Sequence, residues 1–160
     1  RMFRAESKGD TPPLDVGAGT GLVAAHLGGA EIDGLDISPE MLEVARAKGL
    51  YRNLIEADLT GPLPLPDDTS GGVISSGTFT HGHVGPGCLP ELLRVAKPDA
   101  LFTCTVVPGV FDSMGFGSSL ALLNAQGRIS PLRFFEFPIY EATDHENAED
   151  RALAMIFRKV

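Results

Sequence analysis

Residues 15–21 read Asp-Val-Gly-Ala-Gly-Thr-Gly, and this stretch decides the fold class. Residues 14–16 predict the end of a strand, and residues 21–27 predict a helix that two glycines then end. Glycine lets the backbone turn sharply and approach a ligand closely. The start of the following helix adds N–H groups and a positive dipole end, which suit a carboxylate or a phosphate. The stretch therefore predicts a ligand-binding turn in an α/β domain, with an ordinary tight connection as the alternative.

The spacing of these glycines is G-x-G-x-G, and it narrows the choice of ligand. Leu22 occupies the position where the dinucleotide fingerprint needs its third glycine, which disfavours an NAD-dependent oxidoreductase. Asp36 follows Gly17 by 19 residues and lies at the end of the predicted second strand. A strand-end carboxylate at about this offset can accept both hydroxyls of a ribose. The glycine turn and Asp36 together predict a nucleoside-containing ligand, while Asp36 taken alone could be a solvated loop acid.

Short apolar segments alternate with helical patterns along the whole chain, which predicts βαβ units and a parallel sheet. Ser38 and Pro39 supply an N-cap and a first-turn proline for the helix after the second strand. We predict strands at residues 14–16, 32–37, 54–57, 72–76, 101–107, 133–140 and 152–160. We predict helices at residues 21–27, 39–49 and 89–96, with 111–126 helical in part.

Composition excludes several classes of function. The formal charge of −8, with 13 scattered Lys and Arg residues, argues against a partner that is held through phosphates. No apolar run approaches the length that spans a bilayer, and the polar residues 1–10 do not resemble a secretory signal. Cys88 and Cys104 lack a metal-type spacing, which fits buried thiols in a reducing compartment. We expect one cytoplasmic domain over residues 1–160, without nucleic-acid or membrane partners.

Three segments, in this order and spacing, resemble the class I S-adenosylmethionine-dependent methyltransferases: residues 15–21, 34–42 and 56–59. Residues 75–86 are similar to the methyltransferase-like subgroup of the Williams–Beuren region. The resemblance implies a Rossmann-like, doubly wound, mostly parallel seven-stranded sheet with a C-terminal antiparallel strand. It also implies S-adenosylmethionine as the cofactor and methyl transfer to a small-molecule acceptor. A homodimer is left open, as is a non-catalytic module that only binds the cofactor.

The same resemblance assigns roles to residues. Glycines of the first motif would flank the methionine moiety, Asp36 would hold the ribose, and Asp58 would meet the adenine amino group beneath Ile37. The expected cofactor-binding residues are Asp15, Gly17, Ala18, Gly19, Gly21, Asp36, Ile37, Met41, Asp58, Leu59, Ser75 and Ser76.

The chain departs from the family pattern at three places. Ser70-Gly71 stands where the family usually has an aromatic-Asp pair, and Asp99 replaces a glycine, which Asp tolerates in a turn. Only fourteen residues precede Asp15, where family members carry helices that cover the cofactor. We therefore expect these lid helices to be missing and the pocket to be open.

The segment after the fourth strand supplies the expected acceptor side of the pocket. Thr78, His81 and His83 are the catalytic candidates, with a histidine as the base if the acceptor must lose a proton. A histidine in a glycine-rich loop is otherwise a hydrogen-bonded turn residue. The H-x-H spacing lacks a nearby third ligand, so no metal site is expected.

Overall fold

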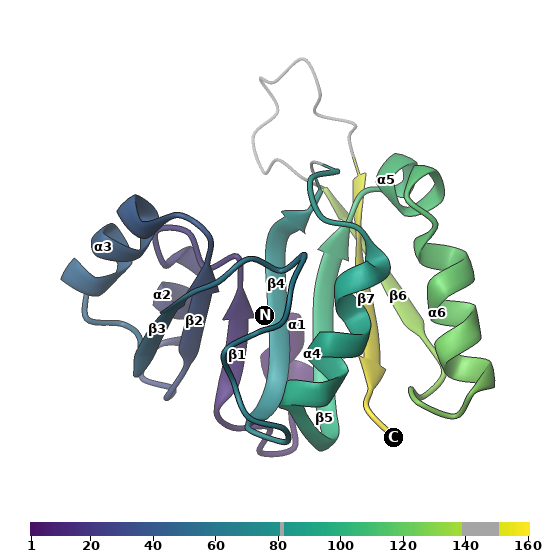
Figure 1. The fold of residues 1–160 in the computed structure, drawn as a ribbon, viewed down its shortest axis with the longest axis horizontal. Coiled ribbons are helices and arrows are strands. Elements are labelled where there is room, and N and C mark those ends of the chain that lie inside the picture. The colour runs from purple at the N-terminus through teal and green to yellow at the C-terminus, as the bar shows by residue number, and fades with distance from the viewer. Residues whose placement is uncertain (81, 139–150) are drawn as a thin grey trace.

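A computed structural model describes residues 1–80, 82–138 and 151–160, and these form one seven-stranded sheet with helices on both faces (Figure 1). The strand order is β3-β2-β1-β4-β5-β7-β6, with parallel pairing from β3 to β5 and antiparallel pairing of β7 with both neighbours. The predicted Rossmann-like architecture is confirmed. The strands are Pro13–Val16 (β1), Asp33–Asp36 (β2), Asn53–Glu56 (β3), Ser70–Phe79 (β4), Ala96–Val106 (β5), Arg133–Pro138 (β6) and Arg151–Arg158 (β7). The helices are Met2–Glu6 (α1), Leu22–Leu27 (α2), Pro39–Ala47 (α3), Leu89–Val95 (α4), Pro108–Ser113 (α5) and Phe116–Ala125 (α6), with a 3₁₀ turn η1 at Pro86–Cys88.

Strands β4 and β5 are longer than predicted because their pairing continues past two shifts of register. The parallel register of β4 against β5 shifts after Ser70 and again after Ser75, and each shift adds paired residues at one end. Asp99 adopts a φ of +65°, the left-handed conformation expected where the family has glycine. Gly115, with a φ of +76°, divides the predicted helix 111–126 into α5 and α6.

The N-terminal segment holds a helix that the sequence pattern did not predict. Phe3 on α1 is buried against the middle of the sheet, where Gly72 leaves space for its ring. A Cβ at Gly72 would lie only 2.8 Å from that ring. A helix of five residues carries too little periodicity to be read from sequence, and tertiary packing stabilises it. It covers the sheet and contributes no residue to the pocket described below.

Side chains alternate along the strands and so contribute to a hydrophobic core on each face of the sheet. Leu14, Val73 and Phe102 pack with α4 and α6, whereas Ile74 and Leu101 pack with α1 and α2. On α3 the buried residues are Leu42 and Ala45, while Met41 and Val44 are about half exposed. This doubly wound arrangement leaves only the strand ends open for a site.

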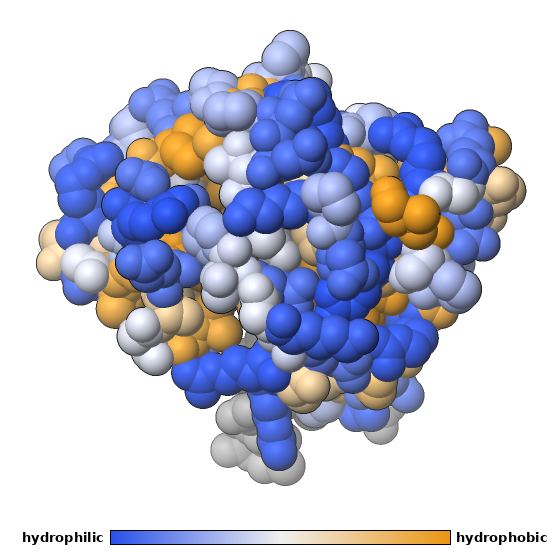
Figure 2. All heavy atoms as spheres, turned by 90° about the horizontal axis from the view of Figure 1, so that it is seen from below, coloured by the Kyte–Doolittle hydropathy of each residue, from blue (hydrophilic) through white to orange (hydrophobic). Residues whose placement is uncertain are grey.

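Ion pairs join the C-terminal residues to the N-terminal segment and to the loop before β4. Arg158 contacts Asp10 at 2.8 Å and Lys159 contacts Asp68 at 2.9 Å. Hydrophilic residues dominate the view of the molecule from this side, and hydrophobic residues show in separate areas (Figure 2). In the described part of the chain, no helix is long and apolar enough to cross a membrane.

The outer strand β6 leaves two of its phenylalanines partly exposed. Phe134 and Phe135 remain 44% and 38% exposed because β6 lies at the sheet edge. Phe134 packs edge-on against Phe111 of α5, with ring centroids 5.7 Å apart. Phe134 therefore packs on one face of the sheet at its edge strand.

Candidate functional site

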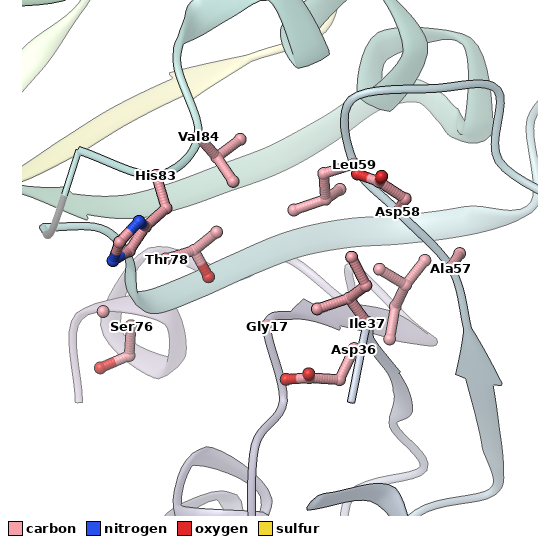
Figure 3. Close-up of a pocket in the computed structure, with 12 residues that line it drawn as sticks. Gly17, Asp36, Ile37, Ala57, Asp58, Leu59, Ser76, Thr78, His83 and Val84 are labelled. Carbon is pink, nitrogen blue, oxygen red and sulfur yellow. The ribbon is translucent and has the colours of Figure 1, made fainter. Parts of the chain in front are cut away.

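A pocket of about 270 Å³ opens at the carboxyl ends of β1, β2, β3 and β4. It lies where the chain crosses from β3 back to β4 beside β1, the point at which open α/β sheets bind ligands. Ser76 and His83 lie at one end of it and Asp58 at the other (Figure 3). The pocket is lined by Gly17, Leu35, Asp36, Ile37, Ala57, Asp58, Leu59, Ser76, Gly77, Thr78, His83 and Val84.

The glycine turn after β1 has the backbone that its sequence demands. Gly17, Gly19 and Gly21 adopt φ values of +72°, +54° and +91°. Residues that carry a Cβ disfavour these values, whereas glycine adopts them readily. The N–H groups of Gly17 and Ala18 both donate to the carbonyl of Leu35, at 2.8 and 2.9 Å. The N–H of Gly21 donates to Ala18. Neighbouring backbone therefore already uses these N–H groups of the turn.

Asp36 at the end of β2 joins the turn to the next helix. Its Oδ2 accepts a hydrogen bond from the Gly19 N–H and its Oδ1 accepts one from the Ser38 N–H, each at 2.9 Å. A carboxylate offers about four acceptor positions, so each oxygen keeps capacity for a further donor. Ser38 in turn caps α3, as predicted, by accepting from the Met41 N–H. The carboxylate is thus held in one orientation at the pocket wall.

The far wall of the pocket comes from the loop after β3. Asp58 Oδ1 accepts hydrogen bonds from the N–H and the hydroxyl of Thr60, at 2.8 and 2.7 Å. These bonds lower the pKa of the Asp58 carboxyl and keep it ionised at neutral pH. Ile37 also lines the pocket and is 63% exposed. A flat apolar group between these walls would bury that side chain.

The fourth strand and its loop form the third side. Thr78 Oγ1 donates to the Val16 carbonyl at 2.8 Å and packs against Gly17. A Cβ at Gly17 would lie only 2.1 Å from that oxygen, so the glycine is required by the neighbouring strand as well as by its φ. His83 lines the pocket near Thr78 and Ser76 (Figure 3). His81, the other catalytic candidate, lies outside the described residues.

Six of the expected cofactor residues do not line the pocket. Asp15 lies buried beneath the turn, where its Oδ2 accepts a 2.6 Å hydrogen bond from the Tyr51 hydroxyl. Burial raises the pKa of Asp15 to about 6, the Tyr51 hydrogen bond opposes that rise, and Asp36 adds to it. Ser75 is buried, and no described residue bonds its hydroxyl. The others outside the pocket lining are Ala18, Gly19, Gly21 and Met41.

Four lining residues had not been singled out: Leu35, Ala57, Gly77 and Val84. All four lie inside the segments that carry the family resemblance, 34–42, 56–59 and 75–86, but none had been assigned a role, although Ala57 and Gly77 each neighbour an expected site residue. Leu35 and Val84 are ordinary apolar residues whose exposure to the pocket depends on tertiary packing. Among the residues the structure describes, no group of three His, Cys, Asp or Glu side chains could hold a metal ion.

Comparisons with known proteins agree with this geometry. The family model described as a methyltransferase domain matches residues 14–104. Human methyltransferase-like protein 27 is 45% identical over 96 residues, which cover 58% of this chain and 39% of that protein. Demethylmenaquinone methyltransferase of Symbiobacterium thermophilum is 39% identical over 101 residues, or 57% of this chain and 40% of that enzyme. The chain thus spans about two fifths of the length of these curated relatives.

The fold comparison extends over the whole chain. A solved structure described as an S-adenosylmethionine-dependent methyltransferase from Mesorhizobium loti superposes with a TM-score of 0.70 at 20% identity, covering 99% of this chain and 96% of that one. A structure from Bacillus halodurans described as a methyltransferase gives 0.70 at 16% identity, with 99% and 96% covered. The chain belongs to the methyltransferase domain family and has the fold of the class I S-adenosylmethionine-dependent methyltransferases.

Proposed function

We propose that this chain is the S-adenosylmethionine-binding domain of a methyltransferase that acts on a small molecule. The observation that carries the proposal is the fixed Asp36 carboxylate, which lies at the pocket wall beside the glycine turn. Family membership and the switch-point position of the pocket support it.

The residues present fit this cofactor. Asp36 keeps acceptor positions on both oxygens, which suits two ribose hydroxyls. Ile37 offers an exposed apolar surface for one face of a base, and Asp58 can accept from an amino group at the far wall. Asp15 Oδ1 is buried, and no described residue donates to it, so the negative charge beneath the turn lacks a cation. A ligand with a sulfonium and an α-ammonium group would supply positive charge near this carboxylate.

Methyl transfer asks the protein mainly for alignment. When bound, S-adenosylmethionine supplies an activated methyl group that an acceptor atom takes by in-line displacement. The chain's own residues hold the two reactants in line and exclude water between them. We assign Thr78, Ser76 and His83 to the acceptor side, since they line the end of the pocket away from Asp58. The Thr78 hydroxyl proton is already donated to Val16, so Thr78 serves as a wall and as an acceptor.

Two observations support a small-molecule acceptor. The net charge of −8 does not suit a nucleic acid, and several relatives are named demethylmenaquinone methyltransferases. The two cysteines are buried free thiols, which agrees with our proposal of a cytoplasmic location.

The test combines binding with turnover. Calorimetry should detect S-adenosylmethionine and its demethylated product, and incubation of the folded protein with isotope-labelled cofactor and a metabolite pool should label one compound. Binding without any labelled product would favour the non-catalytic module. Absence of binding by folded protein would refute the proposal. Light scattering on the same sample reports whether the chain is a homodimer.

A further inference from the structure

Asp15 is a carboxylate at the end of β1 with 0% exposure, directly before the glycine turn. Its two oxygens differ in their surroundings. Oδ2 accepts the Tyr51 hydroxyl proton at 2.6 Å, whereas Oδ1 is buried and receives no hydrogen bond from the described residues. An unpaired buried carboxylate oxygen is costly, so its retention needs a functional explanation.

The backbone on two sides determines where the Tyr51 hydroxyl lies. A Cβ at Gly34 would come within 2.8 Å of the Tyr51 ring, and one at Gly21 would come within 3.2 Å. Glycines at these two positions therefore leave the slot that the ring fills between β2 and the start of α2. The ring cannot swing away without leaving that slot. The hydrogen bond to Asp15 is thus built into the packing of the domain.

The charged groups around Asp15 are few. Asp36 faces it from β2 and Tyr51 from the segment before β3. Lys48 of the loop after α3 approaches the outer side of the same turn, where its Nζ donates to the Thr20 carbonyl at 2.7 Å. Asp33 pairs with Arg52 at 2.7 Å. In the sheet Asp33 lies beside Leu14, whereas Asp15 lies beside Gly34, so the Asp33 side chain points to the opposite face of the sheet from Asp15.

We propose that Tyr51 is a positioning residue of the cofactor site, which holds Asp15 in place and ionised beneath the glycine turn, so that cofactor affinity is coupled to one proton on Asp15. The proposal rests on the proposed binding of S-adenosylmethionine. That cofactor carries a sulfonium and an ammonium against one carboxylate, so its net charge is positive. An ionised Asp15 favours it, and its binding expels the proton from Asp15.

The sign of the pH dependence follows from the state of Asp15. Burial holds the pKa of Asp15 near 6, with Asp36 raising it further and the Tyr51 hydroxyl lowering it. Affinity for S-adenosylmethionine should therefore rise as the pH increases through about 6 and then level off. The demethylated product lacks the sulfonium charge, so its affinity should rise less, and the ratio of the two affinities should increase with pH.

The experiment compares wild type, Tyr51→Phe, Asp15→Asn and the control Glu43→Gln by calorimetry from pH 5 to pH 8. Glu43 is exposed on α3 and pairs only with Arg46 among the described residues, so Glu43→Gln should match the wild type. Tyr51→Phe should weaken binding about tenfold near pH 6.5 and move the rise in affinity to higher pH. Asp15→Asn should remove the pH-dependent rise. Titration in buffers of different ionisation enthalpy should show proton release for the wild type near pH 6.

A wild type that binds with a flat pH profile, or a rise that persists unchanged in Asp15→Asn or in Tyr51→Phe, overturns the coupling while the proposed function stands. A folded wild type that binds neither compound overturns both. If Tyr51→Phe does not fold, carboxyl ¹³C NMR of the wild type replaces it. The Asp15 signal should titrate near pH 6 in the free protein and at lower pH with S-adenosylmethionine present, and an unchanged midpoint overturns the proposal.

Discussion

The hydroxyl of Thr78 donates to the carbonyl of Val16 across 2.8 Å, which fastens the end of β4 over the glycine turn of β1. The two residues are separated by 62 positions in the chain. The contact closes the floor of the pocket, because Thr78 occupies the space that a side chain at Gly17 would need. The glycine turn and the end of β4 therefore act as one structural unit.

Gly17→Ala tests this relationship. The substitution should lower the free energy of unfolding by roughly 2–4 kcal/mol, from the positive φ and from the clash with Thr78 Oγ1. Gly49→Ala is the matched control, since Gly49 has a φ of +63° and no neighbour within 4 Å. It should cost only about 1–2 kcal/mol. In chemical denaturation the double variant Gly17→Ala, Thr78→Ala should recover part of the loss, and strict additivity would contradict the contact.

Asp36→Ala should weaken binding of S-adenosylmethionine by about 1.5–3 kcal/mol, because it removes a charged acceptor and frees the Gly19 N–H. Calorimetry measures the change. The control is Asp67→Ala, which removes an exposed carboxylate that pairs with Arg94 far from the pocket. Equal affinities for Asp36→Ala and the wild type would exclude Asp36 from the site.

His83→Ala should lower turnover by about 10²-fold and leave the cofactor affinity nearly unchanged, if His83 acts on the acceptor. The measurement is kcat with saturating cofactor once an acceptor is found. His26→Ala is the control, since His26 lies exposed on α2 and contacts the Leu22 carbonyl. Unaltered turnover in His83→Ala would leave the histidine as a turn residue.

Asp15→Asn should stabilise the fold in alkaline solution. Burial raises the pKa of Asp15 from its ordinary value of 3.8 to about 6, so the folded chain binds this proton more tightly than the unfolded chain. Stability is therefore lost as the pH rises from about 4 to 6, and the loss is complete above that window. The variant avoids this loss and should gain on the order of 2 kcal/mol at pH 8 and little at pH 3.5. Thermal unfolding at both pH values measures it, and an equal gain at both would contradict the assignment.

Duplex DNA and structured RNA should bind weakly and without a steep dependence on salt. The chain has a net charge of −8, and many of its arginines pair with acids, including Arg94, Arg133 and Arg158. Fluorescence anisotropy at two salt concentrations is the measurement. A tight complex with a steep salt slope would show an organised basic surface.

Most of the fold could be predicted from sequence because local rules point to it. The glycine turn, the capping pair Ser38-Pro39 and the alternation of apolar segments each demand one local structure, and together they predict a doubly wound sheet. Prediction failed where stability comes from distant partners. Helix α1 depends on the insertion of Phe3 against Gly72, and the extra length of β4 depends on its pairing with β5.

The site divides in the same way. The sequence by itself determined the glycines of the turn and the strand-end acid Asp36, since their chemistry and spacing can be read along the chain, while the role expected for Asp58 followed from the resemblance of residues 56–59 to the family's third motif. Only the tertiary structure decided that the turn's N–H groups are already used, that Thr78 closes on Val16, and that Tyr51 bonds Asp15. Apart from the local bond between Gly21 and Ala18, these contacts join residues 17 to 62 positions apart, and the chain's folding brings them together. Spacing along a sequence predicts which residues share a strand end, whereas hydrogen-bond partners depend on distances that only packing sets.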